Sequence, residues 1–427
     1  MKCKNCKSPR LKKILTVGSQ PISSVFYKQK KFNLKRYPLD LYKCKSCNLI
    51  QFSKLAPLED MYGSTYGYRT SLSKYMIDHM KDKYLKINNS KYLKKNSRVL
   101  DIGSNDGTFL NFFANNRKDL KLFGMDPSSF KFKKYYNKNI NLFSDYFSKK
   151  RLDKFCNDQN IKKEGFDLIT SFAMFYDIED PNSFSKDIFN CLRKNGIWVL
   201  EFSYFPLLLK NLTYDQICHE HVTYYTLSTF KSIAEKNGFK ILDYSLNEIN
   251  GGSIEVICGK KNSIYKSKLN KINELLEKEK KINDESYENL GYRIENTKEI
   301  LKLLLKNIKK NDIIGYGAST KGNIVLNHCS ISSKDLAYIC DANPYKFNRY
   351  TPGSNIKIIS KEKMRKMKPK YLLVLIWSFR SEVIKQEMKF LKNGGKLIFH
   401  LPMLHIIDKN NYRDFLKKDF SSFSYSF

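Results

Sequence analysis

The sequence predicts an α/β protein in which two Rossmann-like units follow a small cysteine-rich domain. Strand-like and helix-like stretches alternate along most of the chain, as in proteins with parallel sheets. A strand, a glycine-containing turn and a helix follow one another twice, at residues 97–114 and 312–329. The chain of 427 residues is also too long for one ordinary hydrophobic core. We therefore expect more than one domain.

Changes in composition divide the chain into three expected domains. Residues 1–70 are rich in cysteine, lysine and tyrosine and hold only short strand-like runs. Residues 71–265 hold the first α/β unit, whose last stretch, 241–260, is typical of a β-hairpin. Residues 266–427 begin with a charged stretch that lacks proline, which predicts one or two long linking helices before the second α/β unit.

Composition excludes two classes of protein. With 41% hydrophobic and 14% aromatic residues, the chain is too apolar to be a disordered polymer. It contains no apolar run of about 18 residues, so we expect no membrane span. The first residues, MKCKNCKSPR, carry charge without an apolar segment behind them, so we expect no signal peptide and a cytoplasmic location.

The formal net charge of +35 raises the possibility of a nucleic-acid partner. The lysines, however, are spread through every segment, in runs such as FKFKKYY at 130–136, and form no arginine-rich stripe. A solvated lysine-rich surface is the simpler interpretation. A positive field that favours an anionic small substrate is the second, and we expect no nucleic-acid partner.

Four of the ten cysteines form two C-x-x-C pairs, Cys3 with Cys6 and Cys44 with Cys47. Each two-residue gap lets both thiolates reach one tetrahedral zinc ion at about 2.3 Å per sulfur. A structural zinc ion would stabilise a segment too short to build a large core. Two unrelated reduced pairs and a nucleic-acid-binding zinc ribbon are the alternatives. The other six cysteines occur singly, and we expect them to be reduced core thiols.

The first glycine turn predicts a site for S-adenosylmethionine. Gly103 lets the backbone approach a ligand closely, and the following helix presents free N–H groups. Asp101 ends the strand and can accept a hydrogen bond from the ligand, while Asp126, after the next strand, is placed to bind ribose hydroxyls. A dinucleotide site would favour G-x-G-x-x-G, which this turn lacks. The predicted cofactor-binding residues are Asp101, Gly103, Asn105, Asp106, Gly107 and Asp126.

A cluster of ionisable residues, His219-Glu220-His221, follows a predicted strand at the edge where α/β sheets carry their sites. A metal site is one alternative, although the spacing matches neither a helix face nor the H-E-x-x-H pattern. A buried structural turn is a second. We favour general acid–base chemistry, because a neutral imidazole with a pKa of about 6.5 takes up a proton at working pH while a carboxylate orients it.

Taken together, these stretches resemble the bacterial sugar C-methyltransferases that act on nucleotide-linked 4-keto-deoxyhexoses. The family has an N-terminal zinc-binding domain, a central class I methyltransferase domain and a C-terminal Rossmann-like domain, so the resemblance implies the same fold class here, and we expect a monomer. Besides the cysteine pairs, the matching stretches are YGSTYGYRTSLSKYM, VLDIGSNDGTFL, YDQICHEHVTYYT, NGGSIEV, GYGASTKGN and DANPYKFNRYTPG.

The resemblance implies roles for individual residues. His221 would be the general base, with Glu220 beside it, and would remove the proton next to a ketone so that an enolate attacks the methyl group. Tyr66 and Tyr68 match tyrosines that border the reaction site. A glycine turn with a lysine at a helix start is also a place for phosphate, with a second dinucleotide site as the alternative. The residues implied to bind a nucleotide-sugar between the central and C-terminal domains are Gly317, Ser319, Lys321 and Asn323.

Three positions depart from the family pattern. Cys218 stands where a tyrosine often precedes His-Glu-His, Asp177 where a histidine is common, and Glu255 where an arginine is common. The sugar, and the choice between carbon and oxygen as methyl acceptor, therefore stay open. A sugar O-methyltransferase is the first alternative function. A nucleic-acid-binding or nucleic-acid-modifying enzyme, suggested by charge and zinc, is the second.

Overall fold

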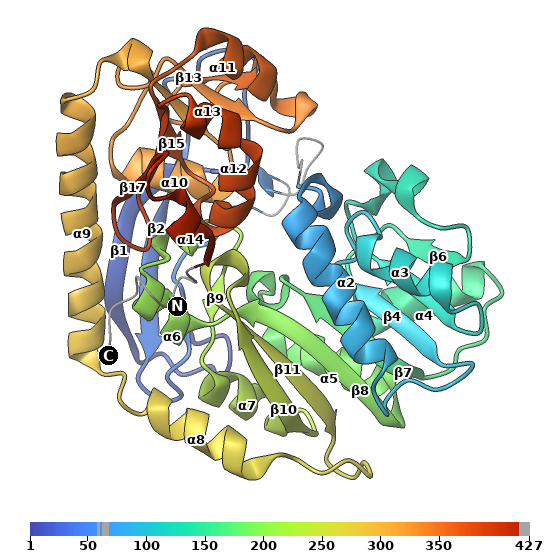
Figure 1. Ribbon diagram of the computed structural model, residues 1–427. Coiled ribbons are helices and arrows are strands. Elements are labelled where there is room, and N and C mark those ends of the chain that lie inside the picture. Colours follow the sequence, from blue (N-terminus) through green and yellow to red (C-terminus); the bar gives the residue numbers. More distant parts are fainter. Residues whose placement is uncertain (58–59, 62–67, 418–427) are drawn as a thin grey trace.

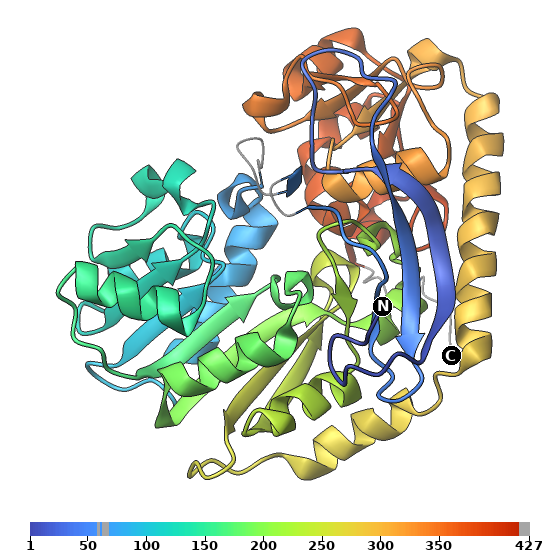
Figure 2. The same cartoon turned by 180° about the vertical axis from the view of Figure 1, so that it is seen from behind.

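A computed structural model describes residues 1–57, 60–61 and 68–417. Within these residues the strands form three sheets, of seven, six and four strands, which Figures 1 and 2 show from opposite sides. One lobe carries most of the seven-stranded sheet, and the other carries the six-stranded and four-stranded sheets (Figure 1).

The central sheet has the order β10-β11-β8-β7-β4-β5-β6. Its strands β4 to β8 are parallel, and β11 runs antiparallel to both of its neighbours, which confirms the predicted hairpin. The strands are β4 (Arg98–Ile102), β5 (Lys121–Met125), β6 (Ile140–Phe143), β7 (Phe166–Phe172), β8 (Leu192–Ser203), β10 (Phe239–Asn247) and β11 (Ser253–Lys260).

Helices cover both faces of the central sheet because successive strand residues point in opposite directions. Val99 and Leu122 pack in one cluster with α2 and α3, whereas Leu100 and Phe123 pack in another with α4, α5 and α7. These helices are α2 (Lys74–Asn88), α3 (Thr108–Asn116), α4 (Lys149–Asp158), α5 (Pro181–Cys191) and α7 (Leu227–Lys236). Helix α6 (Phe205–Asn211) packs instead in the core that also holds the C-terminal sheet.

The C-terminal sheet has the order β14-β13-β12-β15-β16-β17, with β17 antiparallel to a parallel group. The sequence indicated four of these strands but missed the short strands β14 and β17. The strands are β12 (Ile313–Tyr316), β13 (Tyr338–Asp341), β14 (Lys357–Ser360), β15 (Tyr371–Val374), β16 (Lys396–Phe399) and β17 (His405–Ile407). The helices are α10 (Thr320–His328), α11 (Lys361–Met367), α12 (Arg380–Gln386), α13 (Met388–Lys392) and α14 (Tyr412–Lys417).

The N-terminal sheet includes one strand from the middle of the chain. Its order is β1-β2-β3-β9, from β1 (Leu11–Pro21), β2 (Arg36–Cys44), β3 (Ile50–Phe52) and β9 (Thr223–Tyr224). Strand β9 follows the His-Glu-His cluster directly, so the cluster is anchored to this sheet. The division of the chain at residues 70 and 265 stays a prediction. The N-terminal sheet extends across the boundary at residue 70, because it includes β9.

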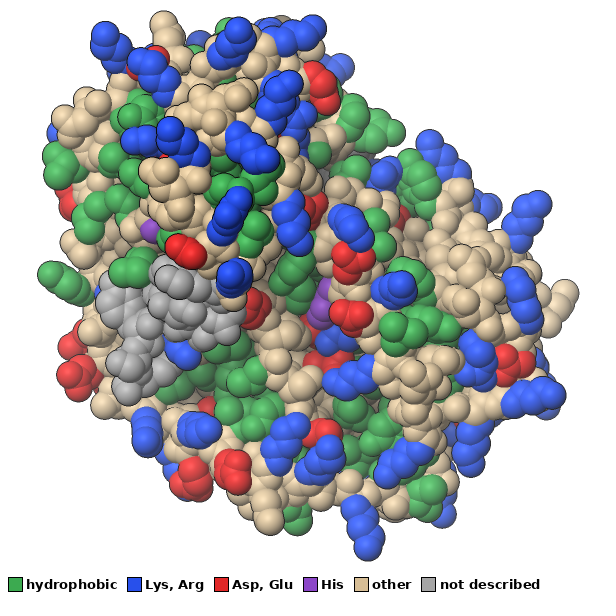
Figure 3. Space-filling model, viewed as in Figure 1, with side chains coloured by type: hydrophobic (Ala, Val, Ile, Leu, Met, Phe, Trp, Pro, Cys, Tyr) green, Lys and Arg blue, Asp and Glu red, His purple; other side chains and the backbone are tan. Residues whose placement is uncertain are grey.

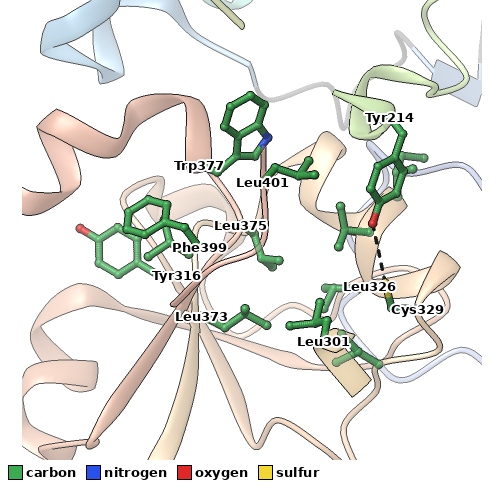
Figure 4. Packing of buried hydrophobic residues seen from close by; sticks show 14 of the residues in the cluster. Tyr214, Leu301, Tyr316, Leu326, Cys329, Leu373, Leu375, Trp377, Phe399 and Leu401 are labelled. Atoms are coloured by element: carbon green, nitrogen blue, oxygen red, sulfur yellow. Dashed lines mark hydrogen bonds between the residues drawn. The ribbon is translucent and has the colours of Figure 1, made fainter. Parts of the chain in front are cut away.

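Two linking helices, α8 (Leu269–Glu279) and α9 (Asp284–Lys306), confirm the expectation for the charged stretch. The long helix α9 runs along β1 on the outside of the molecule (Figures 1 and 2). The N-terminal sheet, α9 and the C-terminal sheet share one hydrophobic core, to which Tyr214 and Trp377 contribute (Figure 4).

Two features bear on the expected partners of the protein, namely the distribution of basic side chains and the length and polarity of the helices. On the face shown in Figure 3, lysine and arginine side chains are scattered rather than gathered into a stripe. No helix in the described part of the chain is long and apolar enough to cross a bilayer.

Candidate active site

A cavity of about 270 Å³ lies at the carboxyl ends of β4 and β5. The chain reverses its direction of sheet building between β6 and β7, so this edge is the topological switch point where α/β proteins bind ligands. The lining includes Tyr68, Met76, Met80, Asp101, Gly103, Asn105, Asp126, Phe172, Met174, Asp177 and Glu179. We call it the donor cavity, after the methyl donor that the sequence predicts at this turn.

Two buried carboxyl groups stand side by side at the floor of the donor cavity. Asp101 Oδ1 accepts a hydrogen bond of 2.7 Å from Thr170 Oγ1, and burial raises the pKa of Asp101 to about 7. Asp126 Oδ2 accepts 3.0 Å from the Asn105 backbone N–H, and burial raises the pKa of Asp126 as well. A ligand that brings cationic groups and a ribose diol satisfies both, because positive charge favours ionised carboxylates and hydroxyls donate to them.

The glycine turn needs both of its glycines. Gly103 and Gly107 each have φ of +75°, in the left-handed region. A Cβ on Gly107 would lie 2.7 Å from the ring of Tyr136, whose hydroxyl donates to Asn105 O at 2.8 Å. Tyr136 thus supports the turn, a role that no local sequence signal indicated.

The predicted turn residues divide into two groups. Gly103 and Asn105 line the donor cavity, whereas Asp106 and Gly107 are absent from its lining. Asp106 Oδ2 accepts 3.0 Å from the Ser71 N–H, and Asn105 Nδ2 donates to Tyr68 O at 3.2 Å. These contacts hold the chain before α2 over the cavity and place Tyr68 at its rim.

The two histidines of the cluster have different surroundings. His219 is buried, with Nε2 3.2 Å from Gln20 O and Nδ1 3.4 Å from Ser23 Oγ, and burial lowers its pKa to about 4. His221 packs on Tyr176, with ring centroids 4.1 Å apart, and burial holds its pKa well below the usual value. Its Nδ1 has no hydrogen-bond partner among the described residues. His219 therefore fastens the N-terminal sheet, while His221 keeps a free lone pair or proton position.

The C-terminal unit approaches the cluster through α10. This helix packs against the turn Tyr214–Gln216, and Asn323 Nδ2 donates to Ser23 O at 2.7 Å. Lys321, in the first turn of α10, has a pKa lowered by burial and opposed by nearby carboxyl groups, of which Asp215 is the strongest. Glu220 belongs to the same group, and burial raises its pKa.

The predicted C-terminal site residues therefore do different things. Lys321 lies in the field of the carboxyl groups of Asp215, Asp177 and Glu220, which we call the acidic cluster. Asn323 holds the N-terminal segment. Gly317, at φ +91°, faces Ile376, and Ser319 Oγ accepts 2.9 Å from the Gly322 N–H as the cap of α10. Tyr66 lies outside the described residues.

The three departures from the family pattern occupy three environments. Asp177 lines the donor cavity, and Cys218 is a buried thiol. Glu255 is buried and accepts 2.5 Å from Lys83 Nζ. Lys83 also pairs with Glu201 at 2.6 Å, and His79 Nε2 lies 2.8 Å from Glu201. Glu255 thus belongs to a charge cluster that fastens α2 to β8 and β11.

The four paired cysteines converge as predicted. Their sulfurs lie within 4.8 Å of one another, with Cys3 to Cys47 at 3.5 Å and Cys6 to Cys44 at 3.6 Å. A tetrahedral zinc ion needs sulfurs about 3.8 Å apart, so the residues fit a zinc site with four cysteine ligands. The six other cysteines are buried and unpaired, as expected of reduced core thiols.

Comparison with known proteins matches the three parts of the chain in order. Residues 3–62 match a zinc binding domain, residues 72–244 a methyltransferase domain and residues 248–402 a C-methyltransferase C-terminal domain. The C-methyltransferase NovU of Streptomyces niveus is 24% identical over 376 residues, which span 87% of this chain and 88% of that protein.

Solved methyltransferase structures also match part of the chain. The plantazolicin methyltransferase BpumL is 12% identical and covers 43% of this chain and 83% of its own, with a TM-score of 0.32. Coclaurine N-methyltransferase is 12% identical and covers 48% and 79%, with a TM-score of 0.34. The matched zinc-binding and methyltransferase domains agree with the cysteine cluster and the donor cavity of the structure. The chain is an S-adenosylmethionine-dependent methyltransferase with a zinc-binding N-terminal domain, and it is similar to C-methyltransferases.

Proposed function

We propose that this methyltransferase methylates a carbon atom of a nucleotide-activated keto sugar, in deoxysugar or surface-polysaccharide biosynthesis, with His221 as the base. The observation that supports this most is the state of His221. Burial keeps its imidazole neutral, and its Nδ1 has no hydrogen-bond partner in the described part of the chain. An imidazole that is neutral at working pH and has one ring nitrogen without a partner can accept a proton.

The acidic cluster supports enolate chemistry. His221 takes the proton from the carbon next to the carbonyl, and the electron pair of that C–H bond moves into the enolate. The positive charge of Lys321 favours the negative charge that develops on the carbonyl oxygen. Glu220, whose Oε2 has no hydrogen-bond partner among the residues described, can accept a hydrogen bond from a substrate hydroxyl.

The position of His221 relative to the donor cavity supports a link between proton removal and methyl transfer. S-adenosylmethionine supplies a methyl group already activated by a sulfonium. Tyr176, which packs on His221, precedes Asp177, which lines the donor cavity. Orientation of the enolate carbon toward the methyl group then contributes to the rate, by about 7–11 kcal/mol in the best intramolecular models.

An anionic nucleotide-sugar agrees with two further features. The net charge of +35 attracts a diphosphate, and the first turn of α10, with Lys321, offers backbone N–H groups and a cation. The acceptor then reaches the cluster from the side of the C-terminal sheet.

The test incubates purified enzyme with methyl-labelled S-adenosylmethionine and a panel of nucleotide-linked keto sugars, and then locates the label by NMR. A carbon-bound methyl signal on one of the sugars is expected. An oxygen-bound methyl signal would assign the enzyme to O-methylation. Label that enters RNA or DNA, and none of the sugars, would overturn the proposed substrate class.

A further inference from the structure

We propose that Asn182 is a positioning residue through which the zinc site sets the shape of the donor cavity, so that zinc and S-adenosylmethionine stabilise each other's binding. The link is a short segment, residues 177–182, which we call the wall segment. Asp177, Ile178 and Glu179 line the donor cavity, and the segment then enters α5. This inference rests on donor and zinc binding alone and is independent of the acceptor.

The wall segment is clamped to the first zinc knuckle. Asn5 stands between the ligands Cys3 and Cys6 and is only 2% exposed. Asn182 Nδ2 donates both to Asn5 O, at 3.1 Å, and to Asn5 Oδ1, at 3.3 Å. Because the metal fixes the sulfurs on either side of Asn5, it also fixes the acceptors on which Asn182 depends.

Asn182 is held from its other side as well. Its Oδ1 accepts 3.0 Å from Asn237 Nδ2, at the end of α7. Asp180, two residues earlier, caps α5 by accepting from the N–H groups of Asn182 and Ser183. The side-chain amide of Asn182 thus connects the first turn of α5 both to the zinc knuckle and to the end of α7.

Ion pairs add less to this clamp. Lys4 Nζ lies 3.6 Å from Glu179, whose side chain is 66% exposed, and Lys7 Nζ lies 3.7 Å from Asp180, with both side chains largely exposed. Exposed pairs contribute little to stability. The amide contacts to the buried Asn5 therefore carry the link, and Lys7 offers a matched control on the same knuckle.

The two faces of the wall segment explain why its position matters. Asp177 and Glu179 line the donor cavity and also a second cavity of about 390 Å³, whose other wall includes Lys4 and Gln51 of the N-terminal domain. The segment is therefore a thin partition with open space on both sides. Ile178 packs against the core of the central sheet, so the clamp acts at the other end of the segment, where it enters α5.

The experiment uses the full-length, zinc-loaded protein and Asn182→Asp, an isosteric change that loses the donor to Asn5 but keeps the acceptor for Asn237. Binding of S-adenosylhomocysteine, the stable product, is measured by calorimetry. Zinc affinity is measured by competition with a chromogenic chelator, with and without saturating S-adenosylhomocysteine. Lys7→Ala is the control, and metal content and thermal melting accompany each variant.

We expect Asn182→Asp to weaken S-adenosylhomocysteine binding about five- to tenfold, within the usual range of coupling between sites. Lys7→Ala should stay within about twofold. In wild type the product should tighten zinc binding by the same factor by which zinc tightens product binding, since linkage is reciprocal. Asn182→Asp should remove this effect.

Two outcomes would overturn the inference. One is Asn182→Asp with wild-type melting, full zinc content and wild-type product affinity. The other is a wild-type zinc affinity that saturating product leaves unchanged, and this second reading holds even if the variant fails to fold.

Discussion

The indole Nε1 of Trp377 donates a hydrogen bond of 2.8 Å to Asp215 Oδ2, and this contact joins the C-terminal sheet to the loop that carries the His-Glu-His cluster. Trp377 is 1% exposed and Asp215 2% exposed. Figure 4 shows the indole packed near Leu375 and Leu401, in the core that also holds Tyr214. A polar bond inside an apolar core fixes the register of two packed units, since each partner would otherwise be buried without a hydrogen bond.

Trp377→Phe tests this contact. Removing the donor from a buried carboxylate should lower the free energy of unfolding by about 2–4 kcal/mol. The pKa of Asp215 is raised by burial, and Trp377 opposes that rise. Without the indole the native pKa of Asp215 should rise further above its unfolded value, so the variant loses additional stability as the pH rises above that unfolded value. Urea unfolding at pH 5 and pH 8 should therefore show the larger loss at pH 8, and an equal loss at both would contradict this account.

Donor affinity should depend on the protonation of Asp101. Its native pKa is about 7, raised by burial, and a cationic donor favours the carboxylate. Affinity should therefore rise about tenfold from pH 6 to pH 8, with protons released on binding near pH 6. Calorimetry in buffers of different ionisation enthalpy measures both effects. Asp101→Asn should bind weakly and lose this pH dependence, and a variant that kept it would assign the titration to another group, such as Asp126.

The two histidines of the cluster should respond differently to substitution. His221→Gln should retain donor binding but lose turnover by about 10²–10⁴-fold, and should stop exchange of the acceptor's α-proton with D2O in NMR spectra. Because burial lowers the pKa of His221 well below its usual value, wild-type turnover should not fall through protonation of this base between pH 6 and 8.

His219→Gln is the matched control. Its ring lies near Gln20 O and Ser23 Oγ, so the loss should appear in the melting temperature rather than in proton exchange. Exchange that survives in His221→Gln and disappears in His219→Gln would reverse the two roles.

Gly107→Ala should damage the cofactor turn. A left-handed conformation costs an L-residue roughly 1–2 kcal/mol, and here the new Cβ also meets the ring of Tyr136 at 2.7 Å. The free energy of unfolding and the affinity for S-adenosylhomocysteine should both fall. Gly394→Ala is the control, because Gly394 has φ of +90° with no atom within 4 Å of a Cβ. Equal losses in the two variants would show that the Tyr136 contact is harmless.

Much of the architecture followed from local pattern. Strand β4 and its glycine turn could be predicted because a buried strand, a left-handed glycine and a helix start are each encoded within a few residues. The cysteine pairs could be predicted for the same reason, since each pair closes its own knuckle. The assignment of Asp101 and Asp126 to adjacent strand ends needed only the parallel order of β4 and β5.

Other features were decided by contacts between distant segments. Strand β9 is two residues long and forms only because β3 offers it a free edge. His219 and His221 are two residues apart and flank the same glutamate, so the sequence does not distinguish their roles. Their roles separate because one meets Gln20 and Ser23 while the other meets Tyr176. The placement of Lys321 among the carboxyl groups of the central unit could not be predicted from its sequence neighbours.

The sequence alone thus determined the cofactor turn, the zinc ligands and the alternation of strands and helices, because each depends on neighbours along the chain. Only the tertiary structure decided which histidine keeps an unpaired nitrogen and how Asn182 joins the zinc knuckle to the donor cavity. Desolvation and hydrogen-bond partners supplied across the fold set these properties, and neither can be obtained from residue spacing.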